Sequence, residues 1–158
     1  MANTQSMCTS FLGELMTATH NFGASPVRAA ATADTFKAAL YLASATLNAS
    51  TTVYSATGEV SGTNYTAGGV TVTNATAPSS TNASATAGVG YWTPSASIVY
   101  TTVTLTSSFD TVFIYNSTQS NKAVSVHTFT AQTITAGTFT LTMPSNTTTT
   151  ALLRLVTT

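Results

Sequence analysis

The stretch that decides the fold is VFIYNSTQSNKAVSVHTF, residues 112–129. Two runs rich in β-branched and aromatic residues flank a polar turn sequence, NSTQSN. In the first run aliphatic and aromatic side chains alternate, so we expect both faces of this strand to be covered. In the second run valines alternate with Ser125 and His127, which is typical of a strand with one buried face. The pair predicts antiparallel β-structure.

Similar alternation recurs on both sides of this stretch. Residues 99–105, 139–143 and 153–155 repeat it in the second half of the chain, and residues 36–42 and 70–73 repeat it in the first half. The alanines of 36–42 leave a helix as an alternative there. Short strands joined by Asn, Ser, Gly and Pro turns predict a mainly β chain, an antiparallel β-sandwich or barrel. A length of 158 residues indicates a single domain over 1–158.

Three segments depart from the strand pattern. Residues 1–8 are expected to form an extended arm. Residues 9–22 carry apolar side chains at helical spacing, which predicts a short N-terminal helix packed on the sheet. Residues 74–90 contain hardly any large apolar group and predict an exposed loop excursion. Between residues 50 and 69, tyrosines spaced among glycines predict an ordered loop with aromatic anchors.

Charge is scarce throughout the chain. Only 5% of the residues are charged and the formal net charge is zero, against about 25% charged residues in an ordinary soluble domain. Threonine fills roughly a quarter of the chain, far above average usage. Without charges to guard them, strand edges are expected to be covered by neighbouring subunits or by Thr- and Gly-rich loops. Low net charge also favours association, so a homo-oligomer is expected.

The same composition argues against several classes of protein. Four scattered Lys and Arg residues do not make the basic face that nucleic acid requires. The N-terminus lacks the pattern of a signal peptide, and no window has the 18 apolar residues of a membrane span. Synthesis in a cytoplasm is therefore expected. Cys8 is the only cysteine and is expected to be a small buried apolar residue.

The residues that support catalysis are also few. His20 is expected to be a turn residue and His127 a strand-packing or surface residue, so no catalytic residue is predicted. No paired carboxylates or His-x-x-x-His motif are present, which argues against zinc, and Asp34, Glu59 and Asp110 are too far apart in sequence for a carboxylate calcium loop. No metal and no cofactor are predicted.

The glycine-rich motifs are not phosphate loops. Gly68-Gly69 lacks the following Lys-Ser/Thr, and residues 88–90 precede Tyr-Trp-Thr-Pro rather than a helix. Glu59 is a lone acid among turn residues, and we expect it to accept backbone N–H bonds that hold its loop in place.

Aromatic residues at the ends of polar segments serve either as core residues or as interface anchors. The arm at 1–8 and the excursion at 74–90 are the segments expected to reach neighbouring subunits. The candidate interface residues are Met1, Ala2, Asn3, Thr4, Tyr65, Tyr91 and Trp92.

Several runs resemble a family of small virion structural proteins of tailed bacteriophages. They are residues 36–41, 51–69, 112–124, 135–144 and 152–155, together with Ser10-Phe11 and His20-Asn21-Phe22, where many relatives have Asp in place of Asn21. The resemblance covers most of the chain except 74–90, and it implies a component of the phage particle. No functional residue carries over, because the matching runs look like fold motifs.

Small size, β content and the shortage of catalytic groups narrow the expected particle component to a capsid decoration (cement) protein. It would bind the major capsid protein lattice on the outer surface of the virion as a homo-oligomer, with no nucleic acid and no membrane partner. The alternative is a tail or fibre-tip receptor-binding component, in which Tyr65, Tyr91 and Trp92 stack on sugar rings. An enzyme acting on the cell envelope is a third reading, which the shortage of acids and histidines disfavours.

Overall fold

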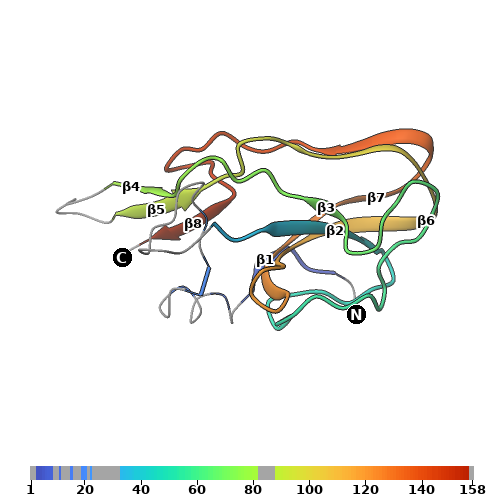
Figure 1. Cartoon of the computed structure of the whole chain (residues 1–158), viewed down its shortest axis with the longest axis horizontal. Helices are drawn as coiled ribbons and strands as arrows, with labels where there is room; N and C mark the ends of the chain where they lie inside the picture. Colours follow the sequence, from blue (N-terminus) through green and yellow to red (C-terminus); the bar gives the residue numbers. More distant parts are fainter. Residues whose placement is uncertain are drawn as a thin grey trace.

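The computed structural model describes residues 3–8, 11, 15, 19–20, 22, 33–81 and 88–156. This part of the chain is mainly β and forms two antiparallel sheets, as predicted (Figure 1). One has five strands in the order β1-β7-β6-β2-β3 and the other has three in the order β4-β5-β8. The strands are β1 (Ser6–Met7), β2 (Phe36–Leu42), β3 (Val70–Thr71), β4 (Ser79–Ser80), β5 (Val89–Trp92), β6 (Ile98–Asn116), β7 (Lys122–Leu141) and β8 (Leu153–Val156).

A long hairpin, β6–β7, dominates the larger sheet. Its strands have 19 and 20 residues, so the four separate strands expected between 99 and 143 are joined into two. The register between β6 and β7 shifts at several points, and Thr102 and Ala136 have positive φ values of 54° and 48°. Bulges of this kind bend a strand and increase its twist. The hairpin accordingly curls over at one end of the molecule (Figure 1).

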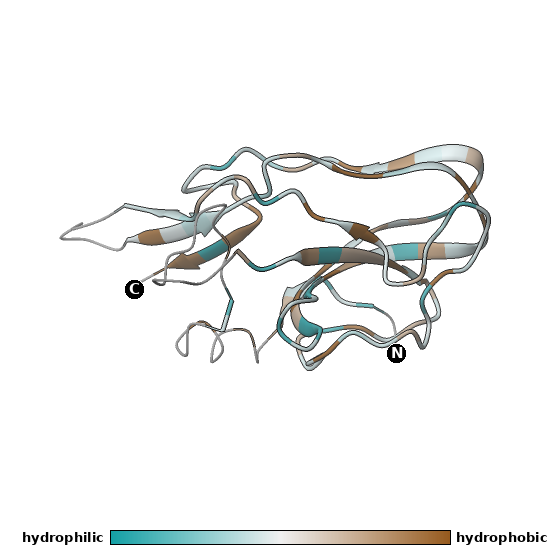
Figure 2. Ribbon diagram, in the orientation of Figure 1, coloured by the Kyte–Doolittle hydropathy of each residue, from teal (hydrophilic) through white to brown (hydrophobic). Residues whose placement is uncertain are grey.

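The core lies inside this curl. Strand β2 pairs with β6 from Phe36↔Asn116 to Leu42↔Phe109, which confirms the strand expected at 36–42. Residues 111–116 are all buried, so both faces of this part of β6 are covered, as the alternation predicted. Figure 2 shows apolar residues along β2 and β3.

A loop of the chain covers the free edge of β2. The N–H of Leu42 donates to the carbonyl of Gly58 at 2.9 Å, and that of Val60 donates to Leu40 at 3.0 Å. Further along, Thr63 and Thr104 exchange two backbone hydrogen bonds. One of the two expected kinds of edge cover is therefore present: a Thr- and Gly-rich loop lies along this side of the sheet.

The helix predicted over 9–22 is not seen as an element of the described chain, because most of that segment lies outside the described residues. Cys8 is fully buried, as predicted. The rings of Phe22 and Phe36 stack with centroids 4.6 Å apart, and Trp92 packs on Phe22 at 4.7 Å. The segment therefore contributes aromatic side chains to the core.

The segment at 74–90 is only partly a loop. Residues 77–81 are exposed, but Ser79 and Ser80 pair with Tyr91 and Gly90 as β4 and β5. Residues 82–87 lie outside the described part of the chain. Among the described residues, no helix has the length and hydropathy needed to cross a membrane.

Candidate functional site

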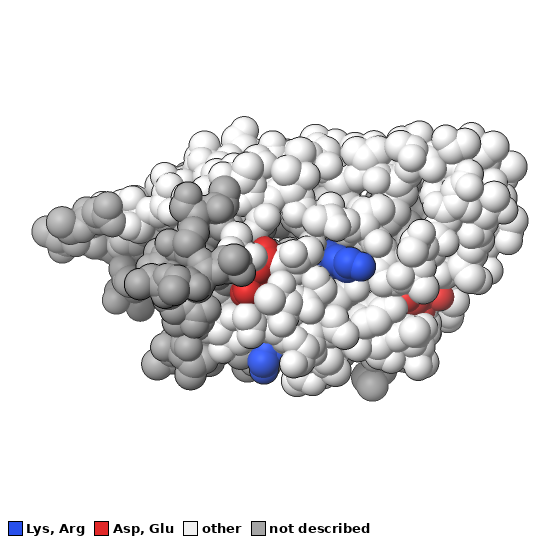
Figure 3. Space-filling view, viewed as in Figure 1, with Lys and Arg blue, Asp and Glu red and all other residues white. Residues whose placement is uncertain are grey.

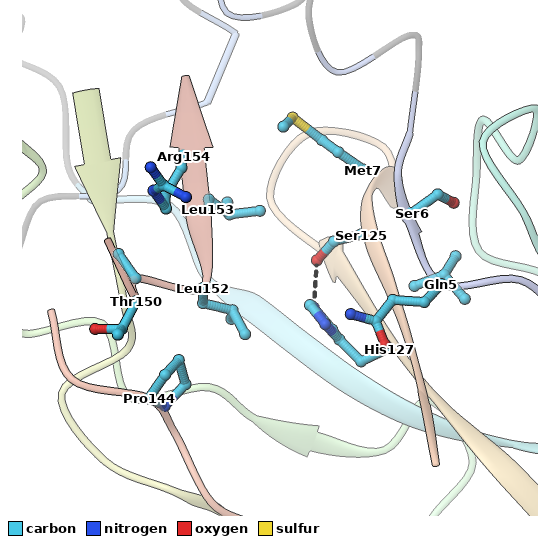
Figure 4. A pocket seen from close by; sticks show the side chains of 12 residues that line it. Gln5, Ser6, Met7, Ser125, His127, Pro144, Thr150, Leu152, Leu153 and Arg154 are labelled. Carbon is cyan, nitrogen blue, oxygen red and sulfur yellow. Dashed lines mark hydrogen bonds between the residues drawn. The ribbon is translucent and has the colours of Figure 1, made fainter. Parts of the chain in front are cut away.

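A recess of about 440 Å³ lies between β1, β7 and the C-terminal segment (Figure 4). Strand β7 contributes Ser125 and His127, and β8 contributes Arg154. The lining residues are Gln5, Ser6, Met7, Ser125, Val126, His127, Pro144, Thr150, Ala151, Leu152, Leu153 and Arg154. Polar and apolar groups therefore meet in one hollow.

Among the residues that line this recess, Ser125 and His127 are the pair that resembles a nucleophile and its base. Ser125 Oγ lies 2.8 Å from His127 Nε2 (Figure 4). The pair forms because residues two apart on a strand point to the same face. Burial lowers the pKa of His127 to about 4, so the imidazole is neutral at pH 7 and is a weak base toward the serine hydroxyl.

A neutral histidine beside a serine is only part of a hydrolytic site. Such sites also use a third group that orients the histidine, and donors that bind the oxyanion. No carboxylate is among the residues that line this recess. Arg154 is exposed and its Nε donates to the carbonyl of Thr148 at 2.7 Å. His127 is thus a half-buried strand residue that contacts Ser125, in keeping with the strand-packing role predicted for it.

Glu59 occupies the centre of a second cluster. One carboxylate oxygen accepts from the hydroxyl of Tyr65 at 2.6 Å and from the N–H of Gly68 at 2.7 Å, and the other accepts from Tyr54 at 2.5 Å. The hydroxyl of Tyr65 also accepts from the N–H of Leu40 on β2, at 3.0 Å. The predicted role of Glu59 as an acceptor of backbone N–H is confirmed, and the cluster attaches the loop to the sheet.

Burial and the Glu59 carboxylate together change the acidity of these tyrosines. Burial is the larger cause, and with the hydrogen bond to Glu59 it raises the pKa of Tyr54 and of Tyr65 well above the ordinary value. Both hydroxyls therefore stay protonated and act as donors at any physiological pH. This chemistry suits a structural clamp.

A third polar cluster is buried at the end of β6 and was not predicted. The Nδ2 atom of Asn116 donates to Asp34 Oδ2 at 2.8 Å and lies 3.0 Å from His20 Nδ1. Its Oδ1 accepts from the backbone N–H groups of Thr118 and Gln119, both at 3.1 Å. The one available signal was position: Asn116 ends an apolar run, and Asp34 precedes the run that forms β2. The cluster fixes the turn after β6.

The structure does not gather the candidate interface residues into one surface. Asn3 donates to Asp110 at 2.7 Å, and Thr4 donates to the backbone of Leu47, so this part of the arm binds its own domain. Met1 and Ala2 lie outside the described residues. Trp92 is 3% exposed and its Nε1 donates to the carbonyl of Thr76. Trp92 is thus a core residue.

The two remaining aromatic candidates have different surroundings. The ring of Tyr65 stacks on Tyr100 with centroids 6.0 Å apart, and its hydroxyl is held by Glu59. Tyr91 is half-buried and lines an apolar pocket of about 250 Å³ beside Trp92 and Leu155. Of the described candidates, Tyr91 is the aromatic residue best placed to meet another molecule.

Neither glycine motif is arranged to hold a phosphate. The N–H of Gly68 is already donated to Glu59, and residues 89–90 belong to strand β5. Within the described ranges, no group of three or more His, Cys, Asp or Glu side chains is placed to bind a metal ion.

The surface itself is the most unusual feature of the molecule. Figure 3 shows a face on which a few isolated charged groups stand among uncharged ones. Comparisons of this chain with protein-family models, with curated proteins and with solved structures find no match.

Proposed function

We propose that this chain is a structural protein of a tailed-bacteriophage virion, a capsid decoration protein with a β-sandwich fold. It binds the major capsid protein lattice on the outer surface of the head, as a homo-oligomer, and stabilises it by joining neighbouring subunits. The observation that carries the proposal is the surface: poor in charge, rich in threonine hydroxyls, and borne by a β framework.

The physical argument concerns the cost of removing water. Burying an unpaired charge in an interface is expensive, whereas a hydroxyl that finds a hydrogen-bond partner costs little. Only 5% of the residues in this chain are charged. A partner can therefore cover a large area of its surface without burying unpaired charged side chains. Threonine also suits strands, because its β-branched side chain packs on a pleated sheet.

Aromatic contacts across the curled hairpin pack two parts of the larger sheet, and the loop at Tyr65, against each other. Phe109 and Phe139 meet edge to face at 5.4 Å, and Tyr100 and Tyr65 stack at 6.0 Å. Two layers packed through such residues form a stiff body. A stiff body suits a clamp, since little conformational entropy is lost on binding.

Copy number in purified particles tests the proposal. Quantitative mass spectrometry is expected to find hundreds of copies per virion, located on the head. A few copies located at the tail would instead identify the receptor-binding alternative, for which Tyr91 is the best-placed aromatic residue. Absence from purified virions would contradict both.

Salt provides a second test of the binding mechanism. Contacts between charged groups weaken as ionic strength rises, because the screening length falls from about 10 Å at 0.1 M to about 3 Å at 1 M. We expect the protein to stay on particles through a 1 M NaCl wash. Release by moderate salt would show that ion pairs carry the binding.

The enzymatic reading is tested at Ser125. Because no carboxylate lines the recess beside His127, we expect no labelling of the full chain by a fluorophosphonate probe. Covalent labelling that disappears in Ser125→Ala and in His127→Gln would establish a working nucleophile and contradict a purely structural role.

A further inference from the structure

We infer that the outer edge of β7, residues 128–141, is a self-association surface that pairs antiparallel with the same edge of a second copy of this chain. The inference deepens the proposed function, on which it rests for its biological setting. It concerns the part of the larger sheet that the described chain leaves open.

The two edges of the larger sheet differ in how much of their length other described segments cover. On one side the loop around Gly58, Val60 and Thr63 bonds to the backbones of β2 and β6. On the other side β1 pairs with β7 only at Ser125 and Val126. Beyond that point the arm turns away to bond Leu47 and Asp110.

From residue 128 onward, the strand pairings recorded for β7 in the described part of the chain are with β6 alone. The outward backbone groups of this segment therefore have no strand of the described residues beside them. Such an edge is a template for pairing with another chain.

The edge also lacks the residues that usually protect an edge strand against pairing. Natural edges are guarded by Lys, Pro or inward charges, and residues 128–141 contain none of these. Register shifts do interrupt the strand, but the last stretch runs regularly, with Phe139, Thr140 and Leu141 opposite Tyr100, Val99 and Ile98. Residues 139–141 are thus the segment best suited to accept a new strand, and the register shift at Gly137 lies just before them.

A hollow of about 390 Å³ accompanies this edge, and all of its lining residues belong to β7, at 129–132 and 139–141. Phe129 and Phe139 meet there with ring centroids 4.9 Å apart. Because all of the lining residues belong to β7, the hollow lies at the edge that β7 forms. It gives an arriving strand apolar side chains to pack on in addition to backbone partners.

A second copy is the occupant that fits best. Antiparallel pairing of one strand with its own copy is related by a two-fold axis, so every contact is made twice. Because 128–141 carries no charge, the two copies place no like charges opposite each other. Threonines meet threonines across such a ladder, and cross-strand Thr pairs stabilise sheets.

Analytical ultracentrifugation of the purified full chain, across a concentration series, tests the inference without any capsid. We expect a species of twice the 16.2 kDa chain mass. Thr138→Lys and Thr140→Lys, both at exposed positions on β7, are expected to weaken self-association at least about tenfold, because symmetric pairing brings the new charges together.

Thr101→Lys is the matched control. Thr101 is exposed on β6, one strand in from the edge, so this variant keeps its dimer if pairing is edge to edge. Dimers that survive both β7 substitutions, or that Thr101→Lys also abolishes, would overturn the inference. A chain that is monomeric at every concentration would overturn it as well, whether or not it binds particles.

Hydrogen exchange gives an independent measurement. Backbone amides in 139–141 that face outward are expected to exchange more slowly as the protein concentration rises, and to lose this protection in Thr140→Lys. Protection that does not depend on concentration would contradict pairing with a second copy. Dimers formed by a protein that is missing from virions would refute the proposed function and leave the self-association surface in place.

Discussion

The hydroxyl of Tyr100 donates a 2.7 Å hydrogen bond to the carbonyl of Ala38, and both groups are buried. Tyr100 lies in the first half of β6, whereas Ala38 pairs in β2 with Ile114 from the second half of the same strand. The bond therefore closes the curl of the hairpin, because it joins the two halves of β6 through the strand between them.

Removing this hydroxyl tests the closure of the curl. Tyr100→Phe keeps the ring but leaves the Ala38 carbonyl without this donor in a buried place. We expect a loss of about 1–2 kcal/mol in the free energy of unfolding, measured by chemical denaturation. Tyr91→Phe, at a half-buried position on β5, is the control and should change stability by less than about 0.5 kcal/mol. Equal losses of stability in the two variants would show that the hydrogen bond from Tyr100 to Ala38 does not stabilise the fold.

The same carbonyl restricts Gly69. Its φ of 71° favours glycine, and a Cβ atom there would lie 1.7 Å from the oxygen of Ala38. Gly69→Ala is therefore expected to cost at least about 3 kcal/mol or to prevent folding. Gly90→Ala is matched to it, because a Cβ at Gly90 meets nothing within 4 Å. Thermal unfolding of the two variants side by side measures the difference in their stability. A Gly69→Ala variant as stable as Gly90→Ala would show that residue 69 does not lie close to the Ala38 carbonyl.

Glu59→Gln tests the clamp between the loop and the sheet. The carboxylate accepts from Tyr54, Tyr65 and Gly68, whereas an amide supplies one acceptor oxygen and presents donors in place of the other. We expect a loss of about 1.5–3 kcal/mol, the range for hydrogen bonds to charged groups. Thr57→Gln, exposed in the same loop, serves as the control.

A titration separates this clamp from a general loss of packing. Burial and then the Glu59 carboxylate raise the pKa of Tyr65, so removal of the charge lowers it again. Ultraviolet titration of folded Glu59→Gln should show tyrosinate forming at lower pH than in the unmodified chain. Tyrosinate that forms at the same pH in both proteins would mean that burial alone, and not the carboxylate, raises the pKa of Tyr65.

Acid should weaken the protein through His127. Its folded pKa of about 4 lies below the ordinary histidine value of 6.5, so the unfolded chain binds the proton first as pH falls. Stability is then fully present above pH 6.5 and is lost progressively toward pH 4. Because the ring is only half-buried, we expect a loss of about 1–2 kcal/mol over this range rather than the full shift. His127→Gln removes the titration, and parallel curves for the two proteins would contradict the assignment.

Much of the fold could be predicted because strand patterns are local. The alternation at 36–42 placed β2, and the covered faces of 112–115 followed from apolar side chains on both sides. The break predicted between 105 and 112 is wrong, since Ser107 and Ser108 belong to one continuous strand. Polar residues at a bulge resemble a turn in sequence, and only pairing with β7 shows that the strand continues.

The polar clusters were predicted to different extents. Glu59 was recognised as an acceptor because an acid among turn residues has few other uses, but its tyrosine partners depend on how the loop folds onto the sheet. The pairing of Asp34 with Asn116 joins residues 82 positions apart, and nothing in local spacing indicates it. This hydrogen bond gives two buried polar side chains a partner. The need for such a partner arises only when the core closes.

The amino-acid sequence by itself determined the strand alternation, the shortage of charge and the absence of a recognisable catalytic motif, because these are properties of neighbouring residues and of composition. Only the tertiary structure decided that the hairpin curls, that one edge of the large sheet is covered by the loop at 58–63, and that the edge at 128–141 has no strand other than β6 beside it among the described residues. The physical reason is that an edge is defined by what lies beside it, and what lies beside it comes from distant parts of the chain.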